Sequence, residues 1–181
     1  MSPASAAPLL EGITVLDFTR VLAGPYCTRL LADLGARVLK VERPGEGDDT
    51  RRGYYQLEEE RADQATYFVR LNAVKLSVAL DLSSPVGREV VLDLARIADV
   101  AVENFVPGVA ARIGCGYEAF ARVKPDIVYC SISGFGQTGP MRDTPAFHHI
   151  INAVSGIMHL ERQTDPAPRV GYLQAADVLA G

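Results

Sequence analysis

The sequence has few of the features that mark nucleic-acid binders, secreted proteins and membrane proteins. Its longest basic block is Arg51-Arg52 and its net charge is −4, which argues against binding to nucleic acid or to a membrane surface. It has only three cysteines, Cys27, Cys115 and Cys130, and an odd number in apolar contexts favours free thiols in a reducing compartment. No apolar run is as long as a membrane span, and the first twelve residues do not resemble a secretory signal. We therefore expect a cytoplasmic protein with no nucleic-acid or membrane partner.

Several signatures of nucleotide, hydrolase and metal sites are also missing. The loop after the first apolar run holds one glycine, Gly24, followed by Pro25, so it is neither a dinucleotide fingerprint nor a phosphate-binding P-loop. No Gly-x-Ser-x-Gly elbow is present to carry a serine nucleophile. His148 and His149 are adjacent and would point about 100° apart in a helix, and the cysteines are far apart in sequence. We therefore expect no metal site.

The segments that are present alternate between strand and helix patterns. With 181 residues, about half of them apolar, the chain suits one domain with a substantial core. The strand patterns cover residues 13–18, 37–42, 77–82, 99–105 and 126–133, and the helix patterns cover 26–36, 85–98 and 117–124. In the first helix, Tyr26, Leu30, Leu31 and Leu34 share one side. Because parallel strands need crossover connections, we predict a Rossmann-like, doubly wound, mostly parallel α/β sheet between residues 13 and 133, with helices on both faces.

Two polar segments interrupt this alternation. Residues 43–63 predict a long loop or lid, which is as compatible with a plain surface excursion as with function. Residues 133–147 are rich in glycine and proline and follow a strand, where ligands of doubly wound sheets bind. Residues 1–10 predict a flexible N-terminus.

Four cations lie beside the ends of the predicted strands. They are Arg20, Arg43, Lys75 and Arg112. Together they could bind several phosphates through charge-assisted hydrogen bonds, but for any one of them taken alone a solvated surface charge is the better interpretation. Periodicity does not decide between these interpretations, since only convergence in space would make one site.

Several motifs occur in a fixed order along nearly the whole chain. They are LEGITVLDFTRVLAGPYCTRLLADLGARVLKVERPGEGDDTR, KLSVALDLSSPVGRE, VENFVPG, SISGFGQTGP and the terminal ADVLAG. In this order and spacing they resemble the motifs of the family III CoA-transferases, which include formyl-CoA and carnitine CoA-transferases and alpha-methylacyl-CoA racemase. Family members are considerably longer. The resemblance therefore implies that residues 1–181 form the N-terminal part of their large CoA-binding domain.

The resemblance also implies a reaction and a set of site residues. Asp177 falls on the catalytic aspartate, which takes the acyl group from a thioester as a mixed anhydride. Positions that line the CoA site in the family are occupied here by Val21, Arg43, Asn104, Phe105 and Arg112. Coenzyme A or acyl-CoA would then be a substrate, with a carboxylic acid as its partner in exchange and no covalently bound cofactor. Family members form interlocked dimers, so the resemblance implies a homodimer or a complementing C-terminal chain.

The sequence departs from the family pattern at two places. Ala73 and Leu76 stand where many members have cations, which leaves Lys75 to bind phosphate alone. The racemases use a histidine at the position of Phe147, whereas the histidine here, His148, is one residue later and would face away on a helix. Transfer is therefore favoured over racemisation, and a catalytically incompetent CoA-binding fragment is a third hypothesis. Candidates for the acyl pocket or for acid–base chemistry are Arg20, Gly134, Phe135, Gly136, Gln137 and His148.

Overall fold

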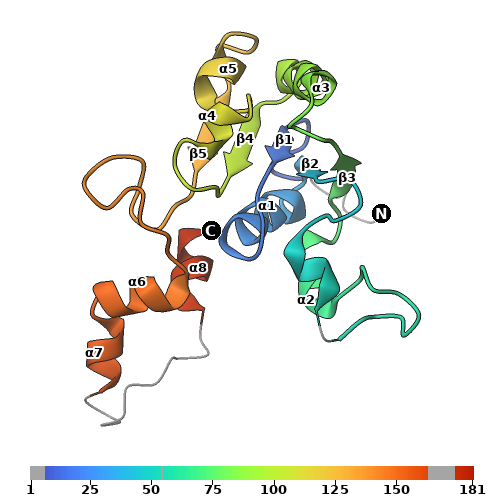
Figure 1. Cartoon of the computed structure of the whole chain (residues 1–181). Helices are drawn as coiled ribbons and strands as arrows, with labels where there is room; N and C mark the ends of the chain where they lie inside the picture. The colour runs from blue at the N-terminus through green and yellow to red at the C-terminus, as the bar shows by residue number, and fades with distance from the viewer. Residues whose placement is uncertain (1–6, 54, 163–173) are drawn as a thin grey trace.

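The centre of the computed structural model, which describes residues 7–53, 55–162 and 174–181, is a parallel sheet (Figure 1). Its strands in chain order are β1 (Thr14–Asp17), β2 (Arg37–Glu42), β3 (Leu76–Ala79), β4 (Val100–Glu103) and β5 (Val128–Ser131). They lie in the order β3-β2-β1-β4-β5, and every neighbouring pair is parallel. This confirms the predicted α/β class and the limits of the sheet. The strand order reverses between β1 and β4, which is where doubly wound sheets open a ligand crevice.

Helices cover both faces of the sheet, as Figure 1 shows for α3 and α5 on one side and α1 on the other. Because side chains alternate along a strand, Leu16 packs in one apolar cluster and Val15 in another. The Leu16 cluster includes Val91 of α3 (Pro85–Arg96) and Phe120 of α5 (Tyr117–Ala121). The Val15 cluster packs against Leu31 of α1 (Ala23–Asp33). The core is therefore two layers separated by the sheet.

The remaining helices are short. They are α2 (Thr66–Asn72), α4 (Val109–Arg112), α6 (His148–Val154), α7 (Ile157–Glu161) and α8 (Ala175–Ala180), with a 3₁₀ turn, η1 (Asp49–Arg52). The η1 turn lies inside the segment 43–63 that we predicted as a loop. Within the described residues, no helix has both the length and the apolar character that crossing a bilayer demands.

Two expectations concern the N-terminal part of the chain, its flexible end and the buried face of its first helix. Of the predicted flexible N-terminus, residues 1–6 lie outside the described residues, whereas the Leu10 N–H donates a 2.9 Å hydrogen bond to the Leu34 carbonyl. The expected leucine face of the first helix is wrong: Leu30 of α1 and Leu34, its C-cap, are 41% and 45% exposed, and the buried positions include Gly24 and Thr28. The helix therefore buries a face of small residues, which lets it approach the sheet closely.

Candidate active site

A cavity of about 1030 Å³ opens at the carboxyl ends of the strands. The end of β2 and the segment after each strand contribute to its wall, with residues 18–23, 40–44, 46–49, 80–83, 104–106 and 132–134. Phe147, Ile151 and Asp177 add wall residues from the C-terminal helical segment. The cavity therefore lies where the reversal of strand order predicts a ligand crevice, and its volume suits a cofactor-sized ligand.

Reciprocal hydrogen bonds join the loops after β1 and β4. The Arg20 N–H donates to Asn104 Oδ1 at 2.8 Å, and Asn104 Nδ2 donates to the Arg20 carbonyl at 2.8 Å. The next residue, Val21, has a φ of +70°, a conformation that is strained for a β-branched side chain. The surrounding hydrogen bonds hold this strain in place, which is common at functional sites. Two residues predicted for the CoA site, Val21 and Asn104, therefore lie together on the cavity wall.

A buried network of charges supports these loops from below. The Asp17 carboxylate accepts hydrogen bonds from Thr28 Oγ1 at 2.7 Å and Lys75 Nζ at 3.0 Å, and Lys40 Nζ lies 3.2 Å from Asp48 Oδ2. Burial alone would raise the pKa of Asp17, but Lys40 and Lys75 outweigh it and hold that pKa below its ordinary value. Burial lowers the pKa of Lys75 to about 8, against the opposing attraction of Asp17. The network therefore holds in place the buried residues that support the loops of the cavity wall.

Three arginines from three different segments of the chain, two loops and helix α4, line the cavity. They are Arg20, Arg43 and Arg112. Arg20 pairs with Asp49, and its buried Nε has no hydrogen-bond partner among the described groups. Arg43 is only loosely held, with Nη1 3.6 Å from Glu46 Oε2 and both side chains 67% exposed. The cations that the sequence placed beside separate strands thus converge, with the exception of Lys75.

Asp177 lies in the first turn of α8 and also lines this cavity. Its helix packs against α1 so tightly that a Cβ on Gly181 would lie 2.3 Å from the Ala23 carbonyl oxygen. At the other end of α8, Tyr67 Oη donates to Gln174 Oε1 at 3.2 Å. Burial raises the pKa of Asp177, while His148 and His149 act in the opposite direction. A partly buried carboxylate of this kind, fixed at a cavity wall, is a candidate nucleophile or base.

The comparisons with known proteins agree with this geometry. A family model described as CoA-transferase family III matches residues 10–181. The chain belongs to CoA-transferase family III. It is 48% identical over 172 residues to the succinyl-CoA:glutarate CoA-transferase of Mus musculus, covering 95% of this chain and 39% of that protein. It is 44% identical over 182 residues to the acetyl-CoA:oxalate CoA-transferase of Acetobacter aceti, covering 99% and 46%. The chain therefore spans less than half the length of these curated relatives.

A solved relative has the same fold. A CAIB/BAIF family protein from Brucella suis superposes with a TM-score of 0.87 at 40% identity, covering 96% of this chain and 46% of that one. The predicted family and the predicted N-terminal portion are thus both confirmed.

Lys75 does not lie where the family III CoA site was expected. Its side chain is 1% exposed and is surrounded by acceptors, which are Asp17 Oδ2, Thr28 Oγ1, Asn72 Oδ1 and the Pro25 carbonyl at 2.7–3.0 Å. It does not line the cavity. The positive φ of Val74, +64°, turns the chain at this point, so a cation that looked like a surface residue is buried in the core.

The loop from 133 to 147 contributes less of the family III cavity than expected. Gly134 lines the cavity, and a Cβ at this position would lie 2.4 Å from Ala146 Cβ, so there is no space for a side chain. Phe135, Gly136 and Gln137 lie outside the lining. Conversely, residues 80–83 line the cavity but were not predicted to do so. The strand pattern 77–82 extended beyond Ala79, where β3 ends, and so hid the start of this loop.

His148 faces Asp177, which corrects the expectation that it would face away. Its Nδ1 lies 3.9 Å from Asp177 Oδ2, although His148 itself does not line the cavity. Phe147, which does line it, is the N-cap of α6 and has extended backbone angles. The two residues are therefore not consecutive positions within a helix, and the expected rotation of about 100° between them does not apply.

Proposed function

We propose that this chain carries the CoA site and the nucleophile of an enzyme that moves CoA between an acyl-CoA thioester and a free carboxylic acid. The observation that carries the proposal is the placing of Asp177 on the wall of the cavity that Arg43 and Arg112 also line. Coenzyme A has phosphates at one end and a thiol at the other, so its site needs cations at one end of a channel and a reactive group at the other. Membership in family III supports this assignment.

The cavity wall offers groups for each part of CoA. Arg43 and Arg112 supply guanidinium groups for the phosphates, which they can bind in bidentate fashion. Phe105 and Val21 supply apolar surface for the adenine, and the Phe105 N–H donates to the Glu103 carboxylate at 2.7 Å. The apolar residues beside Asp177, Ala176 and Ala180, leave room for the acyl end.

The reaction proceeds through two exchanges at one carboxylate. An oxygen of ionised Asp177 attacks the thioester carbonyl carbon, the carbon–sulfur bond breaks, and its electron pair leaves on CoA as the thiolate. The thiolate then attacks the Asp177 carbonyl of the mixed anhydride and releases the donor acid. An acceptor carboxylate attacks the resulting aspartyl-CoA thioester, and the thiolate that leaves attacks the acceptor carbonyl and restores the Asp177 carboxylate.

The acids exchanged are proposed to be short dicarboxylates. The relatives described above are named for glutarate and oxalate, and Arg20 faces the cavity with an Nε that has no partner among the described groups. A second carboxylate on the acid could bind to this guanidinium. Comparing glutarate, oxalate and acetate as acceptors tests this, and equal rates for all three would contradict it.

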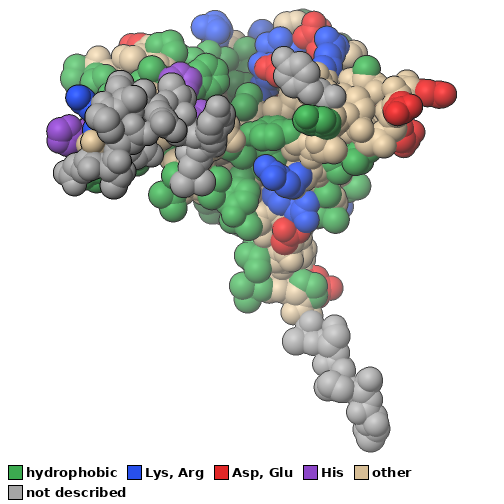
Figure 2. All heavy atoms as spheres, turned by 90° about the horizontal axis from the view of Figure 1, so that it is seen from below, with side chains coloured by type: hydrophobic (Ala, Val, Ile, Leu, Met, Phe, Trp, Pro, Cys, Tyr) green, Lys and Arg blue, Asp and Glu red, His purple; other side chains and the backbone are tan. Residues whose placement is uncertain are grey.

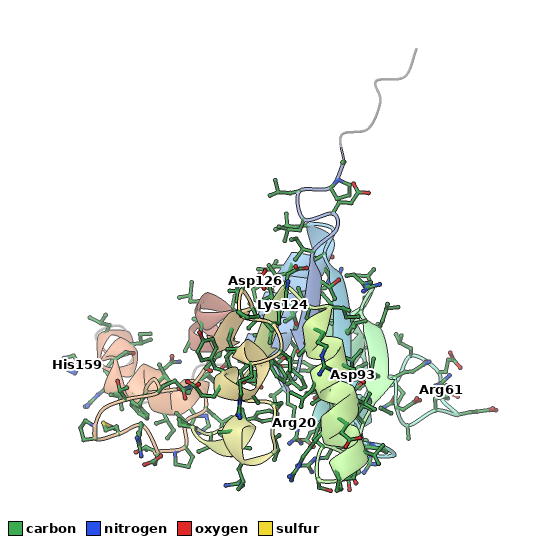
Figure 3. All side chains as sticks on the ribbon, turned by 90° about the horizontal axis from the view of Figure 1, so that it is seen from above. Arg20, Arg61, Asp93, Lys124, Asp126 and His159 are labelled. Atoms are coloured by element: carbon green, nitrogen blue, oxygen red, sulfur yellow. The ribbon has the colours of Figure 1, made fainter. Side chains whose placement is uncertain are left out.

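The test of the proposal is chromatography of CoA esters after mixing the chain with succinyl-CoA and glutarate. We expect glutaryl-CoA to form, and Asp177→Ala to lower the rate on the order of a thousandfold or more. Asp126→Ala removes an exposed carboxylate on the β5 side of the sheet (Figure 3) and is expected to leave the rate unchanged. Equal loss in both variants, or none in either, would contradict the role of Asp177.

A second candidate function is an acyl-CoA racemase, which the proximity of His148 to Asp177 favours. Such an enzyme would exchange the alpha hydrogen of an acyl-CoA for deuterium from solvent without transferring CoA. Tight CoA binding with neither exchange nor transfer would instead identify a catalytically incompetent fragment. A homodimer, or a complementing C-terminal chain, stays a prediction, as does the cytoplasmic location.

A further inference from the structure

His148 is the nearest basic side chain to the proposed nucleophile among the described residues, yet it does not line the cavity. Its Nδ1 lies 3.9 Å from Asp177 Oδ2, and the two side chains are 17% and 25% exposed. This separation is too long for a hydrogen bond and short enough for a strong charge interaction. His148 is therefore placed to act on Asp177 through its charge and not on a ligand by contact.

The surroundings of Asp177 make such a charge valuable. Ala176, Ala180 and Ile151 share its part of the cavity wall, and burial in apolar surroundings disfavours a carboxylate. The groups that act on it come from α6 and α2. From α6 they are His148 and His149, and from α2 the Tyr67 hydroxyl, which is neutral and bound to Gln174. Among the described side chains, the two histidines are the basic groups that act against the effect of burial on Asp177.

One further polar group of α6 lies on the side of the helix that carries His148. Asn152 follows His148 by four residues, so the two side chains lie on the same face of the helix. Asn152 is 4% exposed, and its Oδ1 has no hydrogen-bond partner in the described part of the chain. This face of α6 therefore carries an unpaired acceptor in addition to His148.

We propose that His148, as the imidazolium, is the positioning residue that keeps Asp177 ionised and so sets the lowest pH at which Asp177 can attack a thioester. The inference rests on the proposed function for its role in turnover, but the pairing itself can be measured without turnover. His149 is exposed, with its ring 5.1 Å from that of His148, and makes a smaller contribution. Figure 2 shows histidine side chains gathered at one end of the lower face, beside apolar side chains.

The experiment is a carbon-13 NMR titration of the chain with labelled aspartate carboxyls, in which Asp177→Asn identifies the signal. His148→Gln is expected to raise the proton affinity of Asp177 about fivefold, the effect of one charge at this distance under full water screening. His148→Arg is expected to restore the original affinity, because it replaces the charge. His159→Gln, in the middle of α7 at the outer edge of the molecule (Figure 3), is expected to change nothing.

Parallel CoA-transfer rates separate the two proposals. If transfer occurs, the pH at which the rate falls to half on the acidic side of the profile should rise in His148→Gln and return to its original value in His148→Arg. The maximum rate should be the same in all three proteins. An unchanged Asp177 titration in folded His148→Gln overturns the inference, whatever the rates. A shifted titration without transfer at any pH supports the pairing and contradicts the proposed function.

Discussion

Replacing Lys75 by methionine tests whether this lysine belongs to the core and not to a ligand site. The Lys75 side chain is 1% exposed, and its Nζ lies 3.0 Å from Asp17 Oδ2, which is fully buried. Methionine keeps most of the volume but leaves Asp17 with Lys40 as its remaining cation. Removing one partner of a buried ion pair costs about 3–5 kcal/mol, a large share of the roughly 5–15 kcal/mol that stabilises a typical domain.

Urea denaturation followed by circular dichroism measures this loss, with an unchanged slope expected because the buried area stays similar. Lys124→Met is the matched control, since Lys124 pairs with an exposed Asp126 at 3.1 Å and surface pairs contribute about 0–1 kcal/mol. In the double variant with Asp17→Asn, the loss should be smaller than the sum of the single losses. A loss under about 1 kcal/mol for Lys75→Met, the range of a surface pair, would show that the buried pair does not contribute as described.

Three further predictions follow from the same contacts. Gly24→Ala should destabilise the fold by about 1–3 kcal/mol in urea denaturation, because a Cβ there would lie 2.3 Å from Thr19 Cβ; unchanged stability would contradict this packing. Arg112→Gln should weaken CoA binding in calorimetry about tenfold and reduce its salt dependence, and an unchanged affinity would remove Arg112 from the site. Although burial raises the pKa of Glu42, hydrogen bonds from Arg51 and Ser77 bring it below the ordinary 4.5. The ionised Glu42 carboxylate therefore stabilises the fold fully above the ordinary pKa of 4.5, and this contribution is lost as the pH falls through the lower folded pKa. In Glu42→Gln, the free energy of unfolding should therefore decrease less steeply as the pH falls.

The sheet was predictable because its signal is local. The strand pattern 37–42 coincides with β2, and the helix pattern from Pro85 coincides with the start of α3. There Ser84 Oγ caps the helix by accepting from the Gly87 N–H at 3.0 Å, which is a sequence-readable cap. By contrast, α1 buries small residues where the periodicity favoured leucines, because close approach to the sheet outweighed apolar area.

The site was only partly predictable, because convergence depends on tertiary structure. Arg43 and Arg112 meet at one cavity since parallel strands end at the same edge of the sheet. Lys75 could not be told from a surface cation, because its burial depends on Asp17, 58 positions earlier in the chain. His148 was placed wrongly because the sequence did not show that α6 begins at that residue.

The most direct test of the central claim is a search for an acyl adduct on Asp177. The chain is mixed with acyl-CoA, digested, and analysed by mass spectrometry of the C-terminal peptide. We predict a mass increase on the peptide that contains Asp177, removed by hydroxylamine and absent in Asp177→Ala. A folded, CoA-bound sample with no adduct on Asp177, or with the same adduct in Asp177→Ala, would contradict the account.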